Sequence, residues 1–288
     1  MSMKKTMTRV IIAAVAAAPA TQAWAEGPVV KNGDLIAFMG DSITEGGWDS
    51  PGGYVRLVIN ALETTGIKAT PIPAGVSGHK SDDMLGRLQR DVIDKKPTWM
   101  TLSCGVNDVW HGENGVPLPQ YKTNITAIVN KCQAAGIKVM ILTATVIGED
   151  ENPNNTKLAD YNDFLRSLAK EKKCLLADLN ADMWAGLKAA KGKQSVFTCD
   201  GVHMNPEGDC LMATGVLRAF GLSEQQIRTA REVWMAIPDA INLQGQQGIT
   251  LRQYGQLKAV ADKRKCSVDE MVNGAFAGAV SNLLKTAK

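Results

Sequence analysis

The stretch Asp34-Leu-Ile-Ala-Phe-Met39, followed at once by Gly40-Asp41-Ser42-Ile43-Thr44, decides the fold. Its first part is a short apolar run, which is typical of a strand buried on both faces of a sheet. Its second part brings a glycine and polar residues of the kind that form a turn and begin a helix. The sequence therefore predicts a buried strand that leads directly into a polar turn and a helix.

The same alternation of strands and helices continues to residue 221. Four more strands are predicted at residues 69–76, 98–103, 139–143 and 174–178, and helices at 54–62, 81–94, 120–135 and 158–170. Strands separated by helices of this length imply right-handed crossovers. We therefore predict an α/β fold in which about five parallel strands carry helices on both faces.

The C-terminal residues 223–288 show helical signals and no strand. Two capping boxes, Ser223 with Gln226 and Ser267 with Glu270, each predict the start of a helix, and residues 245–248 are predicted to form a loop between them. We expect an α/β domain over residues 26–222 and a helical extension over residues 223–288. The extension is expected either to pack on the core or to form a lid.

The N-terminal 25 residues have the layout of a secretory signal peptide. Lys4, Lys5 and Arg9 precede a short alanine-rich apolar run at residues 10–20, and Ala23-Trp24-Ala25 supplies the small residues of a cleavage site. The apolar run is shorter than the ~18 residues of a membrane anchor. A lipoprotein anchor would need a cysteine where this chain has Glu26. We predict cleavage after Ala25 and export to the periplasm or the cell exterior.

Composition excludes several classes of protein. The chain has 288 residues, of which 45% are hydrophobic and 21% charged, as in a globular protein rather than a disordered one. The formal net charge of +3 resides in residues 1–25, which leaves 29 of the 32 basic residues against 29 acidic ones. A protein that binds nucleic acid through phosphates keeps a basic excess, so no such partner is expected. No apolar run is long enough to predict a membrane span.

Six cysteines allow 15 disulfide pairings. Cys199 and Cys210 flank Asp200-Gly-Val-His203, so a bridge between them would hold that loop. The alternative is that both are small buried apolar residues. No metal site is expected, because the cysteines and histidines lack the short spacings of a ligand set.

Ser42 is the candidate nucleophile, since functional groups of parallel α/β sheets gather beyond the carboxyl ends of the strands. The alternative is that Ser42 only caps the following helix. A nucleophilic serine needs a base, and the chain has three histidines. Asp200 lies three residues before His203 and can accept its Nδ1–H, which leaves Nε2 free to take the serine proton.

His111 has an aspartate, Asp108, at the same offset, so spacing alone leaves it a rival base. Asp108, however, belongs to a second pattern, Gly105-Val-Asn107-Asp108, which ends the third strand, as Gly75-Val-Ser-Gly78 ends the second. A glycine N–H and an asparagine amide can stabilise an oxyanion. Taken singly, each glycine is explained by a turn and Asn107 by a loop cap, but the set favours an active site.

The chain resembles the SGNH, or GDSL-type, hydrolase family, named for four sequence blocks. The matching blocks are Gly40-Asp41-Ser42, Gly75-Val-Ser-Gly78, Gly105-Val-Asn107-Asp108 and Asp200-Gly-Val-His203. The resemblance covers residues 34–221 and implies a flavodoxin-like, three-layer α/β/α fold. It also implies Ser42 as nucleophile, His203 as base, Asp200 as its orienting partner, and Ser42, Gly78 and Asn107 as oxyanion donors. His79 departs from the family pattern, in which many members carry aspartate after the second-block glycine.

The resemblance implies an esterase that needs no metal and no organic cofactor. Residues 40–46 and 105–110 are most similar to members that remove acetyl groups from carbohydrate, so a small ester or an O-acetylated saccharide is the predicted substrate. Asp41, Trp48 and Trp110 are predicted to contact it; the alternative for both tryptophans is packing under their loops. A lysophospholipase or thioesterase, and a non-catalytic carbohydrate-binding protein, are the rival functions.

Overall fold

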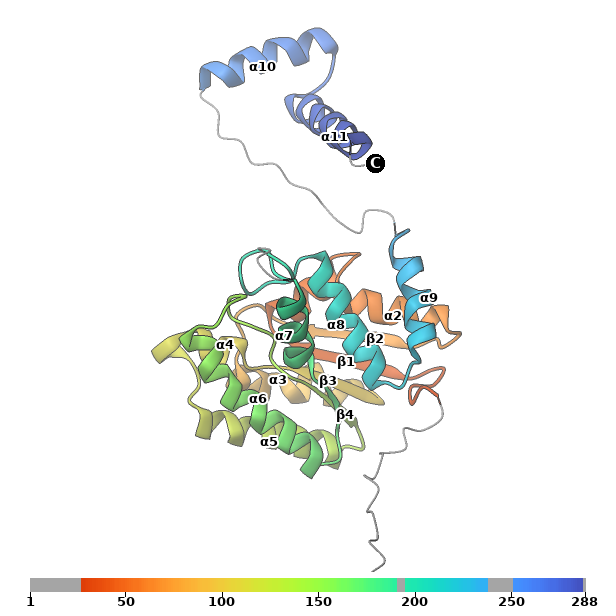
Figure 1. Ribbon diagram of the computed structural model, residues 1–288, viewed down its shortest axis with the longest axis vertical. Coiled ribbons are helices and arrows are strands. Elements are labelled where there is room, and N and C mark those ends of the chain that lie inside the picture. The colour runs from red at the N-terminus through yellow and green to blue at the C-terminus, as the bar shows by residue number, and fades with distance from the viewer. Residues whose placement is uncertain (1–26, 191–194, 238–250, 287–288) are drawn as a thin grey trace, which may run out of the picture. The chain divides into compact units, whose positions relative to one another are not determined.

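The structure is a computed structural model that describes residues 27–190, 195–237 and 251–286 (Figure 1). The predicted signal peptide and the predicted loop at residues 245–248 lie outside these ranges. The chain divides into two compact units, Met1–Ala240 and Ile241–Lys288. Among the described helices, none combines the length and the apolar character that crossing a bilayer requires.

One five-stranded parallel sheet forms the centre of the first unit. Its spatial order is β2-β1-β3-β4-β5. The strands are β1 (Leu35–Gly40), β2 (Thr70–Gly75), β3 (Trp99–Ser103), β4 (Lys138–Leu142) and β5 (Leu175–Ala177). This flavodoxin-like order reverses direction between β1 and β3, and ligands of such sheets bind beyond the carboxyl ends at that point. The predicted fold class is confirmed.

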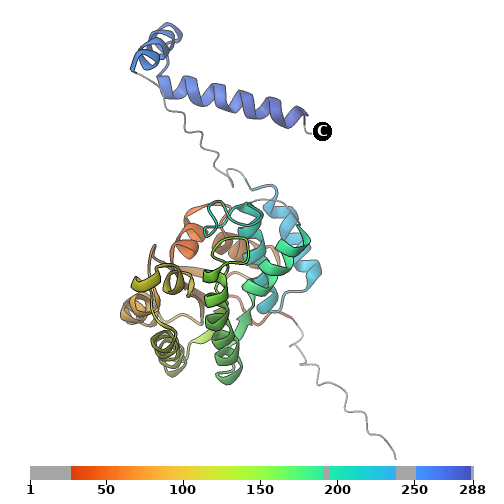
Figure 2. The same cartoon turned by 60° about the vertical axis from the view of Figure 1, so that its left-hand side comes forward.

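Helices cover both faces of the sheet (Figure 1, Figure 2). One face carries α2 (Tyr54–Thr64), α7 (Leu179–Ala189), α8 (Pro206–Ala219) and α9 (Glu224–Trp234). The other carries α3 (Ser81–Asp91), α5 (Leu118–Ala134) and α6 (Pro153–Glu171). Two short helices, α1 (Ser42–Asp49) and α4 (Val106–Trp110), begin directly after β1 and β3. Short 3-10 turns occupy Ile93–Lys95 and Gly112–Asn114.

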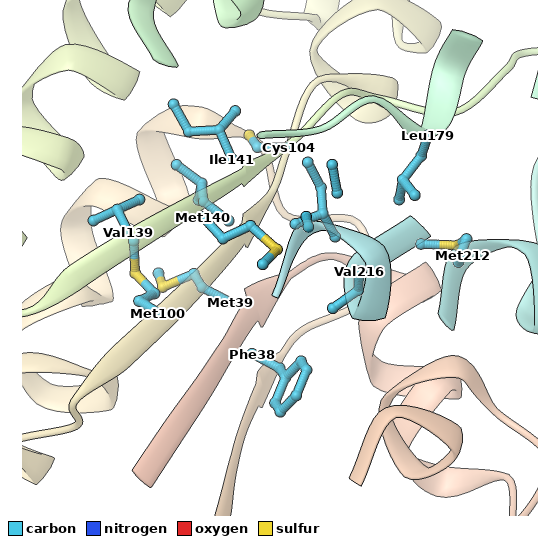
Figure 3. Close-up of a cluster of buried hydrophobic side chains, with 14 of the residues drawn as sticks. Phe38, Met39, Met100, Cys104, Val139, Met140, Ile141, Leu179, Met212 and Val216 are labelled. Atoms are coloured by element: carbon cyan, nitrogen blue, oxygen red, sulfur yellow. The ribbon is translucent and has the colours of Figure 1, made fainter. Parts of the chain in front are cut away.

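The core lies on both sides of the strands (Figure 3). Strand register places Met100 and Val139 opposite each other on one face, where Met39 also points. Phe38, the residue before Met39 in β1, points to the opposite face, where α8 contributes Val216. These side chains are buried, and burial of each large apolar side chain stabilises the fold by about 1.5–3 kcal/mol. The sheet is therefore a firm support for the loops at its carboxyl edge.

Helix α9 belongs to the first unit, so the helical extension does not begin at residue 223 as predicted. Its residues Ile227, Ala230 and Trp234 are buried, with α9 packed beside α2 and α8. The second unit contains α10 (Leu251–Arg264) and α11 (Val268–Thr286). Both predicted capping boxes form, at the starts of α9 and α11.

All six cysteines are free, so the predicted Cys199–Cys210 disulfide is wrong. Cys210 lies in α8 and packs against the core, whereas the Cys199 Sγ lies 3.4 Å from the backbone oxygen of His203. Backbone contacts close the loop instead. Thr198 and Met204 form an antiparallel bridge, and the Cys199 N–H donates to His203 O at 2.9 Å.

Candidate active site

Ser42 is the first residue of α1, two positions beyond the end of β1. Asp41 caps the helix, since its carboxylate accepts a hydrogen bond from the Ile43 N–H at 3.0 Å. The alternative role for Ser42, as the cap, is therefore taken by its neighbour. The Ser42 Oγ instead lies 3.0 Å from the Nε2 of His203.

Two glycines let α1 lie directly on the strand ends. A Cβ on Gly40 would stand 2.0 Å from the Thr44 Oγ1, and one on Gly75 would stand 2.3 Å from the Glu45 nitrogen. The Glu45 carboxylate then accepts hydrogen bonds from both the N–H and the hydroxyl of Ser77. This contact holds the loop after β2 against the helix that begins with Ser42.

That loop carries Gly78, and α4 carries Asn107. Gly78 has a φ of +76°, in the left-handed region that favours glycine. The buried Asn107 donates through Nδ2 to the His79 carbonyl oxygen at 3.2 Å, while its Oδ1 lies 3.2 Å from the His111 Nε2. His111 as the donor fixes the amide orientation, so that one Nδ2 hydrogen stays available for a ligand.

His203 is the one histidine with a hydrogen-bond contact to Ser42; all three lie within the described residues. Its Nδ1 lies 2.6 Å from the Asp200 Oδ2. The second oxygen, Asp200 Oδ1, accepts from the Val202 N–H at 2.9 Å and the His203 N–H at 2.8 Å. The structure thus brings the predicted nucleophile, base and orienting carboxylate into one chain of contacts.

The charge state of Asp200 suits that arrangement. Burial alone would raise the pKa of its carboxyl, but hydrogen bonds from the His203 ring and from backbone N–H groups outweigh burial and hold the pKa below its ordinary value. An ionised Asp200 accepts the His203 Nδ1–H, which leaves Nε2 with a lone pair toward Ser42. The three residues can therefore move a proton from the serine hydroxyl to the imidazole.

Asp41 and Asp108 are buried carboxylates with structural contacts. Burial raises the pKa of Asp41 to about 6, and only 2% of this residue is exposed. The Asp41 carboxylate faces the start of α1, where it accepts from the Ile43 N–H, and its contact with substrate stays a prediction. Asp108 accepts from the Ser81 N–H at 3.0 Å and so holds the start of α3. The Asp108 carboxylate accepts from α3, and the His111 ring contacts Asn107 instead of Asp108 or Ser42. His111 is therefore no longer a rival base.

Arg87 is a site-supporting residue that the sequence did not single out. Its buried guanidinium donates to Gly40 O at 2.8 Å, to Ala74 O at 2.9 Å and to the His79 Nδ1 at 2.9 Å. It therefore joins the ends of β1 and β2 to the loop that follows β2. In sequence it lies in a polar helix, where an arginine is normally exposed, and only its regular spacing from neighbouring apolar positions hints at an inward face.

The two predicted sugar-contacting tryptophans differ in their surroundings. Trp110 ends α4 and is 45% exposed, beside His111. Trp48 packs against the core, and the Arg56 guanidinium lies 4.3 Å from its ring centroid. An open ring surface is thus present at Trp110, whereas one ring face of Trp48 is covered. Both substrate contacts stay predictions.

Within the described ranges, no group of three or more His, Cys, Asp and Glu side chains is placed to hold a metal ion.

Comparison with known proteins places the chain in a family. Residues 38–209 match the GDSL-like lipase/acylhydrolase family. The acetylxylan esterase of Geobacillus stearothermophilus is 27% identical over 214 residues, which cover 67% of this chain and 96% of that protein. The uncharacterized lipoprotein YqeF of Bacillus subtilis (strain 168) is 25% identical over 214 residues, covering 64% and 87% respectively.

Solved structures agree with the sequence match. The crystal structure of the acetyl xylan esterase AlAXEase is 33% identical, with a TM-score of 0.61, and covers 64% of this chain and 98% of its own. The matched residues 38–209 include Ser42, Gly78, Asn107, Asp200 and His203. The chain therefore belongs to the GDSL-like lipase/acylhydrolase family and is a carboxylic ester hydrolase.

Proposed function

We propose that this chain is a serine esterase that removes short acyl groups, chiefly O-acetyl groups, from carbohydrate. The observation that carries the proposal is the chain of contacts from Ser42 Oγ to His203 Nε2 (3.0 Å) and from His203 Nδ1 to Asp200 Oδ2 (2.6 Å). The substrate class is supported by relatives named acetylxylan esterase, which align over nearly their whole length.

The first half of the reaction forms an acyl-enzyme. His203 Nε2 takes the Ser42 hydroxyl proton as Oγ bonds to the ester carbonyl carbon, and the carbonyl electron pair moves onto its oxygen. The N–H groups of Ser42 and Gly78 and the Asn107 Nδ2 stabilise that oxyanion. When the carbonyl re-forms, the bond to the alcohol breaks, and protonated His203 gives its proton to the leaving oxygen.

The second half repeats the same steps with water. His203 takes a proton from the water, whose oxygen attacks the acyl carbon, and the Ser42 Oγ leaves with the returned proton. The products are the free acid and the deacylated saccharide. Asp200 remains a carboxylate throughout and stabilises the protonated imidazole.

We also infer that the chain is exported. The charged, apolar and small-residue layout of residues 1–25 supports export, and one relative is named a lipoprotein. N-terminal sequencing of the protein recovered from outside the cytoplasm is expected to begin at Glu26. A mature protein that still begins with residue 1 would contradict cleavage.

Substitution and labelling test the catalytic proposal. Ser42→Ala and His203→Ala are each expected to abolish nearly all hydrolysis of p-nitrophenyl acetate while the circular-dichroism spectrum stays native. An organophosphate is expected to label Ser42, and absence of labelling would favour a non-catalytic binding protein. Full turnover by folded Ser42→Ala would end the proposal.

A comparison of substrates tests the acyl and alcohol groups. We expect p-nitrophenyl acetate to be cleaved faster than the decanoate, and acetylated xylan faster than phospholipid. The reverse preference would assign the same triad to a lysophospholipase or thioesterase instead.

A further inference from the structure

The Glu149 carboxylate contacts the segment that leads into Asp200 and His203. Glu149 lies in the loop after β4, outside the four sequence blocks. Its Oε1 accepts from the N–H groups of Phe197 and Thr198, each at 2.7 Å, and from the Thr198 hydroxyl at 2.7 Å. Its Oε2 accepts from the Val196 N–H at 2.6 Å. One carboxylate therefore holds three consecutive backbone N–H groups and a hydroxyl.

These hydrogen bonds are of the strong, charge-assisted kind, because the acceptor is ionised. Burial would raise the pKa of Glu149, but the hydrogen bonds from Phe197, Thr198 and Val196 outweigh it, and the pKa lies below its ordinary value. Thr198, which donates two of these hydrogen bonds, is buried, with 1% of the residue exposed. Glu149 is therefore a charged anchor for the Val196–Thr198 backbone.

A second contact joins the same two loops on the other side of Asp200. The Gly148 N–H donates to the Gly201 carbonyl oxygen at 2.7 Å. The antiparallel bridge from Thr198 to Met204 closes the loop that contains both Asp200 and Gly201. Asp200 thus lies between two points at which its loop is bound to residues 148 and 149.

The loop that supplies Glu149 is itself held by α6. Asn155 accepts from the Ile147 N–H at 2.9 Å and donates to the carbonyl oxygens of Gly148 at 3.0 Å and Asp150 at 2.8 Å. Helix α6 packs on the sheet, so it fixes the position of Glu149 relative to the same sheet that carries Ser42. The sheet therefore supports both Ser42, directly after β1, and the loop that carries His203, through α6 and Glu149.

We propose that Glu149 is a positioning residue that keeps the His203–Asp200 pair within hydrogen-bond distance of the Ser42 hydroxyl. The inference rests on the proposed triad. Glu149 contacts neither Ser42 nor the His203 ring, and its four hydrogen bonds all go to residues 196–198. Its loss is therefore expected to displace the base rather than to unfold the sheet.

The matched pair Glu149→Gln and Glu151→Gln tests this. A glutamine at position 149 replaces one acceptor oxygen with an NH₂ group, which cannot accept from a backbone N–H. Glu151 is exposed, and its side chain makes no hydrogen bond or ion pair within the described part of the chain, so the same substitution there is a control.

We expect kcat of Glu149→Gln on p-nitrophenyl acetate to fall by about 10- to 100-fold with KM unchanged, as ångström-scale misplacement of a catalytic group can cost that much. The downfield proton NMR signal of the His203 Nδ1–H, assigned by its loss in His203→Ala, is expected to weaken or shift. Glu151→Gln is expected to match the wild type in both measurements.

Two results would overturn the inference: equal kcat in the two glutamine variants, or a lower kcat in folded Glu149→Gln with an unchanged downfield signal. If Glu149→Gln does not fold, Thr198→Val decides, since it removes one donor and keeps the side-chain shape. It is expected to show a smaller fall in kcat with the same change of signal, and no change would refute the inference. A wild-type chain that fails to hydrolyse the ester refutes the proposed function, whereas the NMR comparison still tests the Glu149 contact.

Discussion

His111 Nε2 lies 3.2 Å from Asn107 Oδ1, and this contact decides which end of the Asn107 amide faces the loop that carries Gly78. With Oδ1 occupied, Nδ2 points to the His79 carbonyl oxygen and has one hydrogen left for a ligand. An oxyanion needs that hydrogen rather than the amide oxygen. A histidine that spacing alone makes a rival base thus orients a donor.

Asn107→Ala is expected to lower kcat by about 10²- to 10³-fold, the usual effect of removing one oxyanion donor. His111→Phe, which leaves the amide in place without its orienting donor, is expected to lower kcat less. Initial rates with p-nitrophenyl acetate at saturating concentration measure both. A wild-type kcat in Asn107→Ala would remove this residue from the oxyanion site.

Asp200→Asn is expected to lower kcat by up to about 10⁴-fold, because an amide neither fixes the imidazole tautomer nor stabilises the imidazolium. The control is Asp160→Asn, the same substitution at an exposed position on α6. Measuring kcat of Asp200→Asn at several pH values separates two causes: a lower kcat at every pH indicates loss of the base, whereas recovery at another pH indicates a shifted pH optimum. Equal activity of the two variants would show that His203 works without its carboxylate partner.

Asp41 is expected to make the folded chain less stable as pH rises from about 4 to 6. The folded state keeps the Asp41 proton up to a pKa of about 6, whereas the unfolded chain releases it near pH 4. In that interval the folded state binds more protons, so the free energy of unfolding falls with increasing pH. The difference of about two pKa units corresponds to at most about 3 kcal/mol.

Asp41→Asn tests this, because asparagine caps helices as well as aspartate but does not ionise. Urea unfolding at pH 7 to 8 is expected to show Asp41→Asn to be more stable than the wild type, and the gain should disappear below pH 4. Asp49→Asn, at the exposed end of the same helix, is the control. Equal pH dependence of Asp41→Asn and wild type would contradict a buried, titrating Asp41.

Trp110→Ala is expected to raise KM for acetylated xylo-oligosaccharides and to leave kcat/KM for p-nitrophenyl acetate unchanged. The reason is that an exposed indole offers a flat apolar surface for a sugar ring, which the small ester does not need. Trp110→Phe is expected to restore part of the affinity. A parallel change in KM for both substrates would assign Trp110 to local packing instead.

Local pattern was enough to predict the sheet and the contact between Asp200 and His203. The strands are apolar runs of the right length, and Asp200 and His203 are three residues apart, so their pairing needs only one short loop. Helix α6 was predicted to start at residue 158 but starts at Pro153, where the Asn152 side chain caps it. That cap is a local signal that the apolar spacing did not contain.

Long-range contacts were out of reach of the sequence. Glu149 meets its partners across 47 to 49 residues, and Arg87 reaches Gly40 across 47. The residues around Glu149 do not distinguish it from a solvated charge, and for Arg87 only the spacing from neighbouring apolar positions hints at an inward face. The Cys199–Cys210 prediction failed for a related reason: closeness in sequence did not show that Cys210 faces the core.

Ser42 and His203 are 161 residues apart in the chain and belong to its first and last sequence blocks. Bringing them together requires β1 and the loop before α8 to reach their final places in the same molecule. Under the proposed mechanism, a nascent or partly refolded chain has no working nucleophile even after β1 to β4 have paired. The recovery of hydrolysis during refolding is therefore expected to report when the loop that carries His203 reaches Ser42, and not when the sheet forms.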